Sequence, residues 1–135
     1  FGAIIRSCEA FGVDAIIIPN DRSVDITGTV VKASVGTIEK VKIIKVTNLN
    51  NTIKKLKDYG YWVVGTDMEG TVYTDIDYKM KTALIIGNEG KGISRLVSEN
   101  CDYLAKIPMS GTVNSLNASV ACGIFLAEIN RSRGV

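Results

Sequence analysis

Glycines cluster where an apolar run of the sequence ends and a helix is expected to begin. The run 84–86 leads into Gly87, Gly90 and Gly92, with Glu89 among them. Glycine has no side chain to hold a ligand away, so backbone amides and carbonyls can approach a flat molecule closely. The pattern predicts either a ligand-binding turn that carries a carboxylate or an ordinary strand-to-helix turn.

This turn departs from the two common motifs that bind nucleotide phosphates. A P-loop requires Gly-Lys-Ser or Gly-Lys-Thr, whereas Lys91 is followed by Gly92. The dinucleotide fingerprint has glycines in the order GxGxxG, whereas this turn has GxxGxG. Both differences argue against a nucleotide held by its phosphates.

A second segment, 107–119, is unusually rich in small polar side chains. It contains Ser110, Thr112, Asn114, Ser115, Asn117 and Ser119. The start of a helix needs one such residue as its N-cap, for which Asn114 or Ser115 is suited. The surplus suggests that this segment contacts a ligand.

A third segment is the start of the chain, where Arg6 interrupts an otherwise apolar amphipathic helix. Taken alone, Arg6 is an ordinary surface arginine.

The sequence has no histidine, which excludes Ser-His-Asp triads, Cys-His pairs, HExxH zinc sites and a histidine general base. Cys8, Cys101 and Cys122 are odd in number and widely spaced, so we expect buried thiols rather than a disulfide framework or a metal site.

The elements that must position these segments alternate between strands and helices. With 135 residues, 46% of them hydrophobic, the chain has the size and composition of one globular domain. Apolar runs predict strands at 15–18, 41–46, 61–64, 83–86 and 103–107, and three-to-four spacing predicts helices at 3–11, 51–59, 92–99 and 115–131. The stretch 66–77 is expected to be one long polar loop. This order predicts an α/β fold with a parallel sheet flanked by helices, whose ligands lie at the carboxyl ends of the strands.

Charge is distributed unevenly although the net charge is only +2. Seven lysines and one glutamate lie between Lys32 and Lys57, whereas 67–77 contains four acidic residues and no basic one. The lysines form either a solvated face or a surface that contacts phosphates.

Three aromatic residues also have two possible roles, as core residues or as platforms on which bases stack: Tyr59, Tyr61 and Trp62. Because no apolar run approaches the ~18 residues of a membrane span, we expect a cytoplasmic protein with no membrane contact.

Together the three segments resemble the motifs of the SpoU-type RNA ribose 2′-O-methyltransferases of the SPOUT superfamily. Gly2 and Arg6 match the first motif, Asn-x-Gly-x-x-x-Arg, whose leading Asn would precede Phe1. The second motif, Gly-x-Glu-Gly-x-Gly, lies at 87–92. The third, Ile-Pro-Met-x-Gly followed by Ser-Leu-Asn-x-Ser-x-Ala, is matched by Ile107, Pro108, Met109, Gly111, Ser115, Leu116, Asn117, Ser119 and Ala121.

The resemblance implies a SPOUT fold with a trefoil knot near the C-terminus, a homodimer, and S-adenosylmethionine as the cofactor without a metal. It implies that the cofactor is held by Gly65, Thr66, Gly87, Asn88, Gly92, Ile107, Met109 and Leu116. The acceptor hydroxyl would be surrounded by Arg6, Glu89, Ser115 and Asn117. The whole chain, 1–135, would be the catalytic domain, without the substrate-recognition domain that commonly precedes it.

The activity implied by the resemblance is methyl transfer to a ribose 2′-hydroxyl in RNA. The sequence as a whole is most similar to those of bacterial enzymes that modify a guanosine of 23S ribosomal RNA. Transfer RNA is the alternative substrate. Two other classes remain open: a non-catalytic RNA-binding relative and an unrelated nucleotide-binding protein.

Overall fold

The computed structural model describes residues 2–20, 29–33, 41–87, 92–112 and 116–135. The strands are β1 Ala15–Pro19, β2 Thr29–Ala33, β3 Lys42–Val46, β4 Trp62–Val72, β5 Thr82–Ile86 and β6 Tyr103–Lys106. The helices are α1 Gly2–Ala10, α2 Leu49–Asp58, α3 Arg95–Glu99 and α4 Ala118–Ser132, with a short 3-10 helix η1 at Tyr73–Asp75. None of the described helices is long and apolar enough to cross a membrane.

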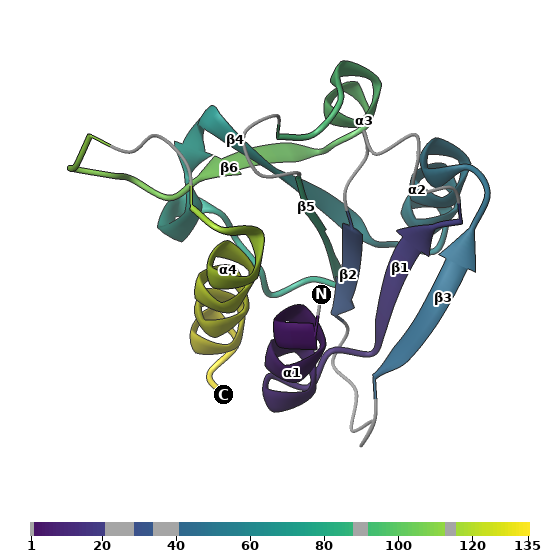
Figure 1. Ribbon diagram of the computed structural model, residues 1–135, viewed down its shortest axis with the longest axis horizontal. Helices are drawn as coiled ribbons and strands as arrows, with labels where there is room; N and C mark the ends of the chain where they lie inside the picture. The colour runs from purple at the N-terminus through teal and green to yellow at the C-terminus, as the bar shows by residue number, and fades with distance from the viewer. Residues whose placement is uncertain (1, 21–28, 34–40, 88–91, 113–115) are drawn as a thin grey trace.

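The strands form one sheet in the order β3-β1-β2-β5-β4-β6, with helices packed against it (Figure 1). β1 pairs in parallel with β3, and β4 pairs in parallel with both β5 and β6. β2 runs antiparallel to its neighbours β1 and β5. The predicted α/β sheet flanked by helices is therefore confirmed, but the sheet is mixed rather than wholly parallel because of one central strand that the sequence analysis missed.

The expectation of a polar loop at 66–77 is wrong. β4 continues to Val72 and is followed by η1. Thr66 and Thr71 both pair with Ala105 of β6, so the four residues between them bulge out of the strand. The prediction of a loop from polar composition failed because a distant strand, β6, supplies the backbone hydrogen bonds that hold this stretch extended.

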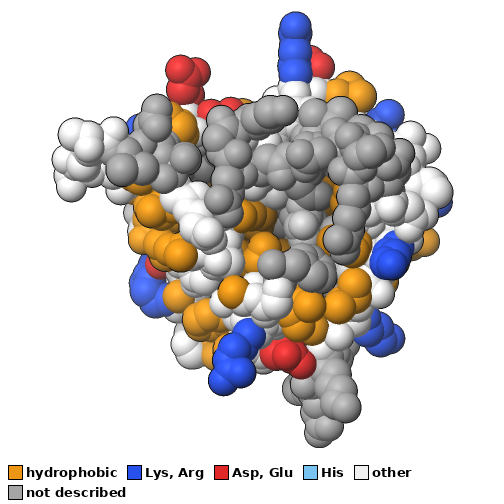
Figure 2. Space-filling view, in the orientation of Figure 1, with side chains coloured by type: hydrophobic (Ala, Val, Ile, Leu, Met, Phe, Trp, Pro, Cys, Tyr) orange, Lys and Arg blue, Asp and Glu red, His pale blue; other side chains and the backbone are white. Residues whose placement is uncertain are grey.

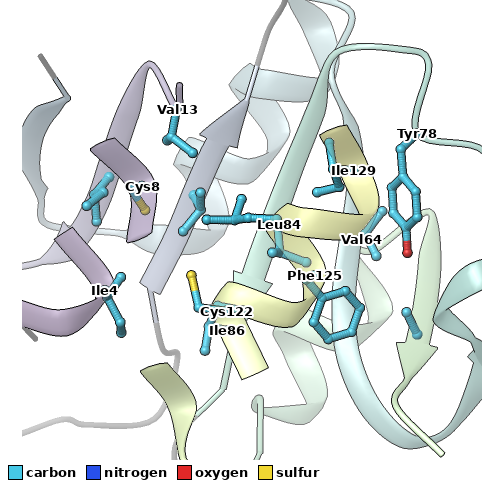
Figure 3. Close-up of a cluster of buried hydrophobic side chains, with 14 of the residues drawn as sticks. Ile4, Cys8, Val13, Val64, Tyr78, Leu84, Ile86, Cys122, Phe125 and Ile129 are labelled. Atoms are coloured by element: carbon cyan, nitrogen blue, oxygen red, sulfur yellow. The ribbon is translucent and has the colours of Figure 1, made fainter. Parts of the chain in front are cut away.

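The sheet has a hydrophobic cluster on each face. On one face, Phe125 and Leu126 of α4 pack with Cys8 of α1 in a single buried cluster (Figure 3). On the other, Ile53 of α2 and Val97 of α3 belong to a second cluster. All five residues of β5 are buried, which accounts for its continuous apolar run, since both of its faces are covered.

The end of α4 is tied to the sheet by one arginine. The Arg133 guanidinium donates hydrogen bonds to the carbonyl oxygens of Tyr78 (2.7 Å), Met80 (2.6 Å) and Ala33 (3.2 Å) and to Thr82 Oγ1 (3.3 Å). These acceptors come from the end of β2, the connection after η1 and the start of β5. A single side chain therefore fixes α4 against three parts of the chain that are distant in sequence.

We expect Arg133→Met to lower the free energy of unfolding by about 2 to 4 kcal/mol, because it leaves these acceptors without a charged donor. Urea denaturation measures the change. Arg95→Met is the matched control, since the Arg95 side chain is 93% exposed and its ion pair with Glu99 is long at 3.9 Å. Equal changes in the free energy of unfolding for the two substitutions would show that the Arg133 hydrogen bonds contribute no more to stability than an exposed arginine does.

Candidate functional site

A pocket of about 270 Å³ opens beside the bulge of β4 and at the carboxyl ends of β5 and β6. The bulge of β4 contributes Asp67 and Met68, β5 ends at the pocket with Ile86, and β6 contributes Ala105 and Lys106. The first turns of α4 form another wall. Ligands of α/β sheets bind at this edge, and the pocket lies where the sequence motifs led us to look.

The structure brings together six of the eight residues predicted to hold a cofactor. They line the pocket: Thr66, Gly87, Gly92, Ile107, Met109 and Leu116. Gly65 is buried directly before Thr66 and is not itself part of the lining. Asn88 lies outside the described residues.

Of the four residues predicted to surround the acceptor hydroxyl, the structure describes two, Arg6 and Asn117, and neither is among the pocket-lining residues. Asn117 is exposed at the rim, between the lining residues Leu116 and Ala118. Arg6 is exposed on α1 and is not among the residues that line the pocket. Glu89 and Ser115 lie outside the described residues.

Two strand ends are drawn together by a hydrogen bond and a backbone contact. The Gly87 amide donates to Thr66 Oγ1 at 3.3 Å, which joins the end of β5 to β4. A Cβ on Gly87 would lie 2.5 Å from the carbonyl carbon of Gly92, closer than any side chain tolerates. Gly92 itself has φ +70°, in the left-handed region that favours glycine. These glycines are therefore required by the backbone path as well as suited to a ligand.

The bulge of β4 is held at both ends. A Cβ on Gly70 would collide with the backbone of Leu104 in β6, so the bulge closes tightly against the neighbouring strand. At its other end, Asp67 Oδ1 accepts a hydrogen bond from the Glu69 amide at 2.8 Å. This local turn directs Asp67 and Met68 to the pocket. Sequence reasoning missed both residues because it treated this stretch as a loop, and Gly70 was the available signal for a bulge.

The start of α4 is capped by a predicted site residue. Asn117 Oδ1 accepts hydrogen bonds from the Ser119 amide (2.9 Å) and the Ser119 hydroxyl (2.5 Å). The expected helix at 115–131 thus begins at Ala118, with Asn117 as its N-cap. Ala118 and Ala121 face the pocket with small side chains, and Phe125 closes it from the core side.

The lining is chemically suited to a flat, partly apolar molecule. Among the lining residues that the structure describes, aliphatic and aromatic side chains predominate, and the charged ones are Asp67 and Lys106. Polar contacts would come largely from backbone groups at the glycine-containing turns. Such a pocket can recognise a heterocycle by main-chain donors and acceptors between apolar walls. Among the described residues, no group of His, Cys, Asp and Glu could hold a metal ion.

The described lysines between Lys32 and Lys57 are not among the residues that line the pocket. Lys57 forms an ion pair with Asp102 at 3.6 Å, and the Lys32 ammonium lies 5.4 Å from the centre of the Tyr61 ring. Residues 32 and 61 lie at the end of the sheet opposite the pocket, since Lys32 is paired with Ala83 near the start of β5. On the face shown in Figure 2, Lys and Arg side chains are scattered around the rim rather than gathered.

The three aromatic residues whose roles were open in the sequence take different environments. Tyr61 is buried in the cluster beneath α2. Trp62 is 40% exposed, with its ring centre 5.9 Å from that of Tyr103, and Tyr59 is 72% exposed. Tyr61 is therefore a core residue, whereas Trp62 and Tyr59 are surface residues.

Comparison with known proteins gives a consistent family. The model of the SpoU rRNA Methylase family matches residues 1–127. A Staphylococcus saprophyticus protein assigned to the TrmH family of tRNA/rRNA methyltransferases is 53% identical over 133 residues, which cover 98% of this chain and 53% of that protein. A Staphylococcus aureus relative with the same assignment is also 53% identical, with 54% of its length covered. The chain thus spans about half the length of the curated relatives it matches.

Solved structures give the same result for the fold. The TrmH/SpoU tRNA modifying enzyme of A. aeolicus is similar with a TM-score of 0.82 and 32% identity, over 99% of this chain and 68% of that one. The SpoU methyltransferase AviRb of Streptomyces viridochromogenes, solved in complex with AdoMet, has a TM-score of 0.78 and 29% identity over 98% of this chain and 55% of that one.

We expect Gly87→Ala to destabilise the protein by about 1 to 3 kcal/mol, because the added methyl group forces the end of β5 away from Gly92. Urea denaturation again measures the change. Gly111→Ala is the control, since a Cβ there meets no atom of the described residues within 4 Å, and it should change stability by less than about 0.5 kcal/mol. A Gly87→Ala protein as stable as the Gly111→Ala protein would contradict the tight packing of this turn.

Proposed function

Because the chain belongs to the SpoU rRNA Methylase family, we propose that it transfers a methyl group from S-adenosylmethionine to a ribose 2′-hydroxyl in RNA. The observation that carries the proposal is the pocket at the bulge of β4 and the carboxyl ends of β5 and β6, which is lined by residues of the second and third family motifs. A guanosine of 23S ribosomal RNA is the target we favour. Transfer RNA is the alternative, and the names of the relatives include both kinds of RNA.

The residues present fit the cofactor. The glycine turn at Gly87 and Gly92 leaves backbone groups accessible, and Ile107, Met109 and Leu116 provide the apolar walls that an adenine ring needs. Gly65, Thr66 and Asn88 complete the predicted set. When bound, S-adenosylmethionine supplies an activated methyl group on a positively charged sulfur. The chain's own task is to hold that methyl group in line with the acceptor oxygen, and such positioning can contribute about 7 to 11 kcal/mol to catalysis.

The acceptor hydroxyl is a poor nucleophile until its proton leaves, and the chain has no histidine to accept it. We assign Arg6 to the developing negative charge on that oxygen or to a neighbouring phosphate. A guanidinium stays protonated at neutral pH, which suits either role and makes it a poor base. Glu89, Ser115 and Asn117 are proposed to orient the ribose.

The position of Arg6 bears on the active form. Arg6 is exposed on α1 and does not line the pocket of its own chain. A homodimer, which we propose as the active form, offers two ways to complete the site: α1 reaches its own pocket or the pocket of the partner. We also propose that the fold contains a knot near the C-terminus, that the protein is cytoplasmic, and that a separate domain recognises the substrate.

S-adenosylhomocysteine should stabilise the chain, whereas ATP and NAD should not. A ligand present at about 100 times its Kd stabilises the folded state by about 2.7 kcal/mol, which raises the thermal midpoint by several degrees. A thermal-shift titration with the three ligands measures this. Stabilisation by ATP or NAD instead would indicate an unrelated nucleotide-binding protein.

Arg6→Ala should reduce methyl transfer by at least about 100-fold, the usual effect of removing a group that stabilises negative charge in the transition state. Affinity for S-adenosylhomocysteine should stay unchanged. Methyl transfer is measured with a labelled methyl group on transcripts of ribosomal and transfer RNA, and Arg95→Ala serves as the surface control. Loss of cofactor affinity would place Arg6 in the cofactor site. Binding of both RNA and cofactor without any transfer by the unmodified protein would favour a non-catalytic relative.

A further inference from the structure

Two of the three cysteines meet where α1 packs against α4. Cys8 on α1 and Cys122 on α4 have no exposed surface and belong to the same buried cluster. Figure 3 shows both side chains in the region between the two helices. Neither residue belongs to the predicted cofactor or acceptor site, so the methyltransferase proposal leaves this pair unexplained.

The two helices approach closely at this point. Gly123, next to Cys122, lies against Ser7, next to Cys8: a Cβ added to Gly123 would be 3.7 Å from Ser7 Oγ. Further along, Asn130 Nδ2 donates a hydrogen bond to the Phe11 carbonyl at 3.2 Å. A disulfide requires Cα atoms about 4.4 to 6.8 Å apart, which helices in such close contact can provide.

The thiols also interact with each other. A hydrogen bond with Cys122 is the main reason that the pKa of Cys8 is raised, and burial adds to the effect. The same hydrogen bond, accepted by the Cys122 sulfur, lowers the pKa of Cys122. The Cys8 thiol therefore stabilises the Cys122 thiolate, and Cys122 loses its proton more readily than Cys8 does.

We propose that Cys8 and Cys122 are an oxidation-sensitive pair that forms a reversible intramolecular disulfide joining α1 to α4. The oxidant is a small peroxide. This site is separate from methyl transfer, although a bond between these helices would connect the helix that carries Arg6 to the helix whose first turns line the pocket.

The chemistry is balanced with hydrogen peroxide as the only co-reactant. The Cys122 thiolate attacks one peroxide oxygen, the O–O bond breaks, and the products are a sulfenic acid and, after protonation, one water. The Cys8 thiol then attacks the sulfur of the sulfenic acid and gives up its proton: the S–S bond forms, the S–O bond breaks, and the leaving hydroxide takes that proton to become the second water. Two thiols lose two electrons and two protons, and one peroxide is reduced to two waters. A thiol reductant reverses the reaction by exchange.

Access to the buried pair is provided by opening of α1. Only Ile4 and Cys8 of its nine residues are buried, and α4 is the helix against which it packs. A nine-residue helix with so small a buried face opens at a lower free energy than the whole domain unfolds. Opening exposes Cys8 and uncovers Cys122 at the same time.

Cys101 is the internal control. It packs with the cluster on the opposite face of the sheet, and its thiol donates a hydrogen bond to the Val97 carbonyl at 3.4 Å. Burial raises the pKa of Cys101 to about 12, so its thiolate is scarce at neutral pH. We expect Cys101 to stay reduced under conditions that oxidise the pair.

The test treats the reduced chain with hydrogen peroxide and maps the thiols by mass spectrometry of peptides prepared without reductant. The expected product has Cys8 linked to Cys122 within one chain, no disulfide between chains, and Cys101 free. Cys101→Ser should leave the linkage intact, whereas Cys8→Ser and Cys122→Ser should each abolish it. A linkage that includes Cys101, a linkage between two chains, oxidation to sulfinic acid without a linkage, or no reaction would overturn the proposal.

A urea titration of the oxidised Cys101→Ser protein excludes a bond formed only after unfolding. A disulfide that fits the folded state restricts the unfolded chain and raises the urea midpoint above that of the reduced form. A lower midpoint would show that the bond distorts the fold, and would overturn the proposal even if the cysteines are linked. Neither measurement depends on RNA or methyl transfer, so failure here is distinguishable from failure of the proposed function.

Discussion

Direct contact between backbone segments at glycine is the constraint on which the pocket depends. Gly87 lies against the backbone at Gly92, and Gly70 lies against Leu104 of β6. No other residue type allows approaches this close, because a Cβ would occupy the space of a backbone atom. As a result, the bulge of β4 and the ends of β5 and β6 converge, and the walls of the pocket expose main-chain groups between aliphatic side chains. The same geometry that closes the turns thus provides the polar contacts.

α4 connects the pocket to the opposite end of the sheet. Its first turns line the pocket with Ala118 and Ala121, while Arg133, just beyond its last turn, is hydrogen-bonded to carbonyls near the opposite ends of the strands. Phe125 lies between these ends, where it both closes the pocket and packs edge-on against Tyr73 with ring centres 5.6 Å apart. Because helices are stiff, the pocket wall is positioned by contacts made at the far end of α4 as well as by its own neighbours.

Local sequence pattern predicted the elements whose burial is continuous. The runs 15–18 and 83–86 correspond to β1 and β5, which are covered on both faces and so are apolar throughout. β2 and the second half of β4 were missed because their conformation depends on partners distant in the chain: β2 pairs with β1 and β5, and Thr71 pairs with Ala105. Four of the six predicted cofactor residues in the pocket follow the ends of β5 or β6, and parallel pairing of both strands with β4 places these ends beside Thr66. The position of Arg6 depends on how α1 packs, and no periodicity contains that information.

The charges near the pocket limit how an RNA backbone can approach it. The bulge of β4 places Asp67 in the lining and Glu69 beside it, and both carboxylates repel phosphate. Lys106 is the cation among the described lining residues, whereas Lys32 and Lys57 lie at the other end of the sheet and are engaged with Tyr61 and Asp102. Among the residues that the structure describes, the pocket of a single chain is therefore well formed for an apolar ring and offers a polyanion one lysine beside two carboxylates. For the proposed reaction, this balance of described charges gives the cation on α1 its importance: Arg6, brought to a pocket by its own chain or by a second copy, adds positive charge for the phosphates of the substrate.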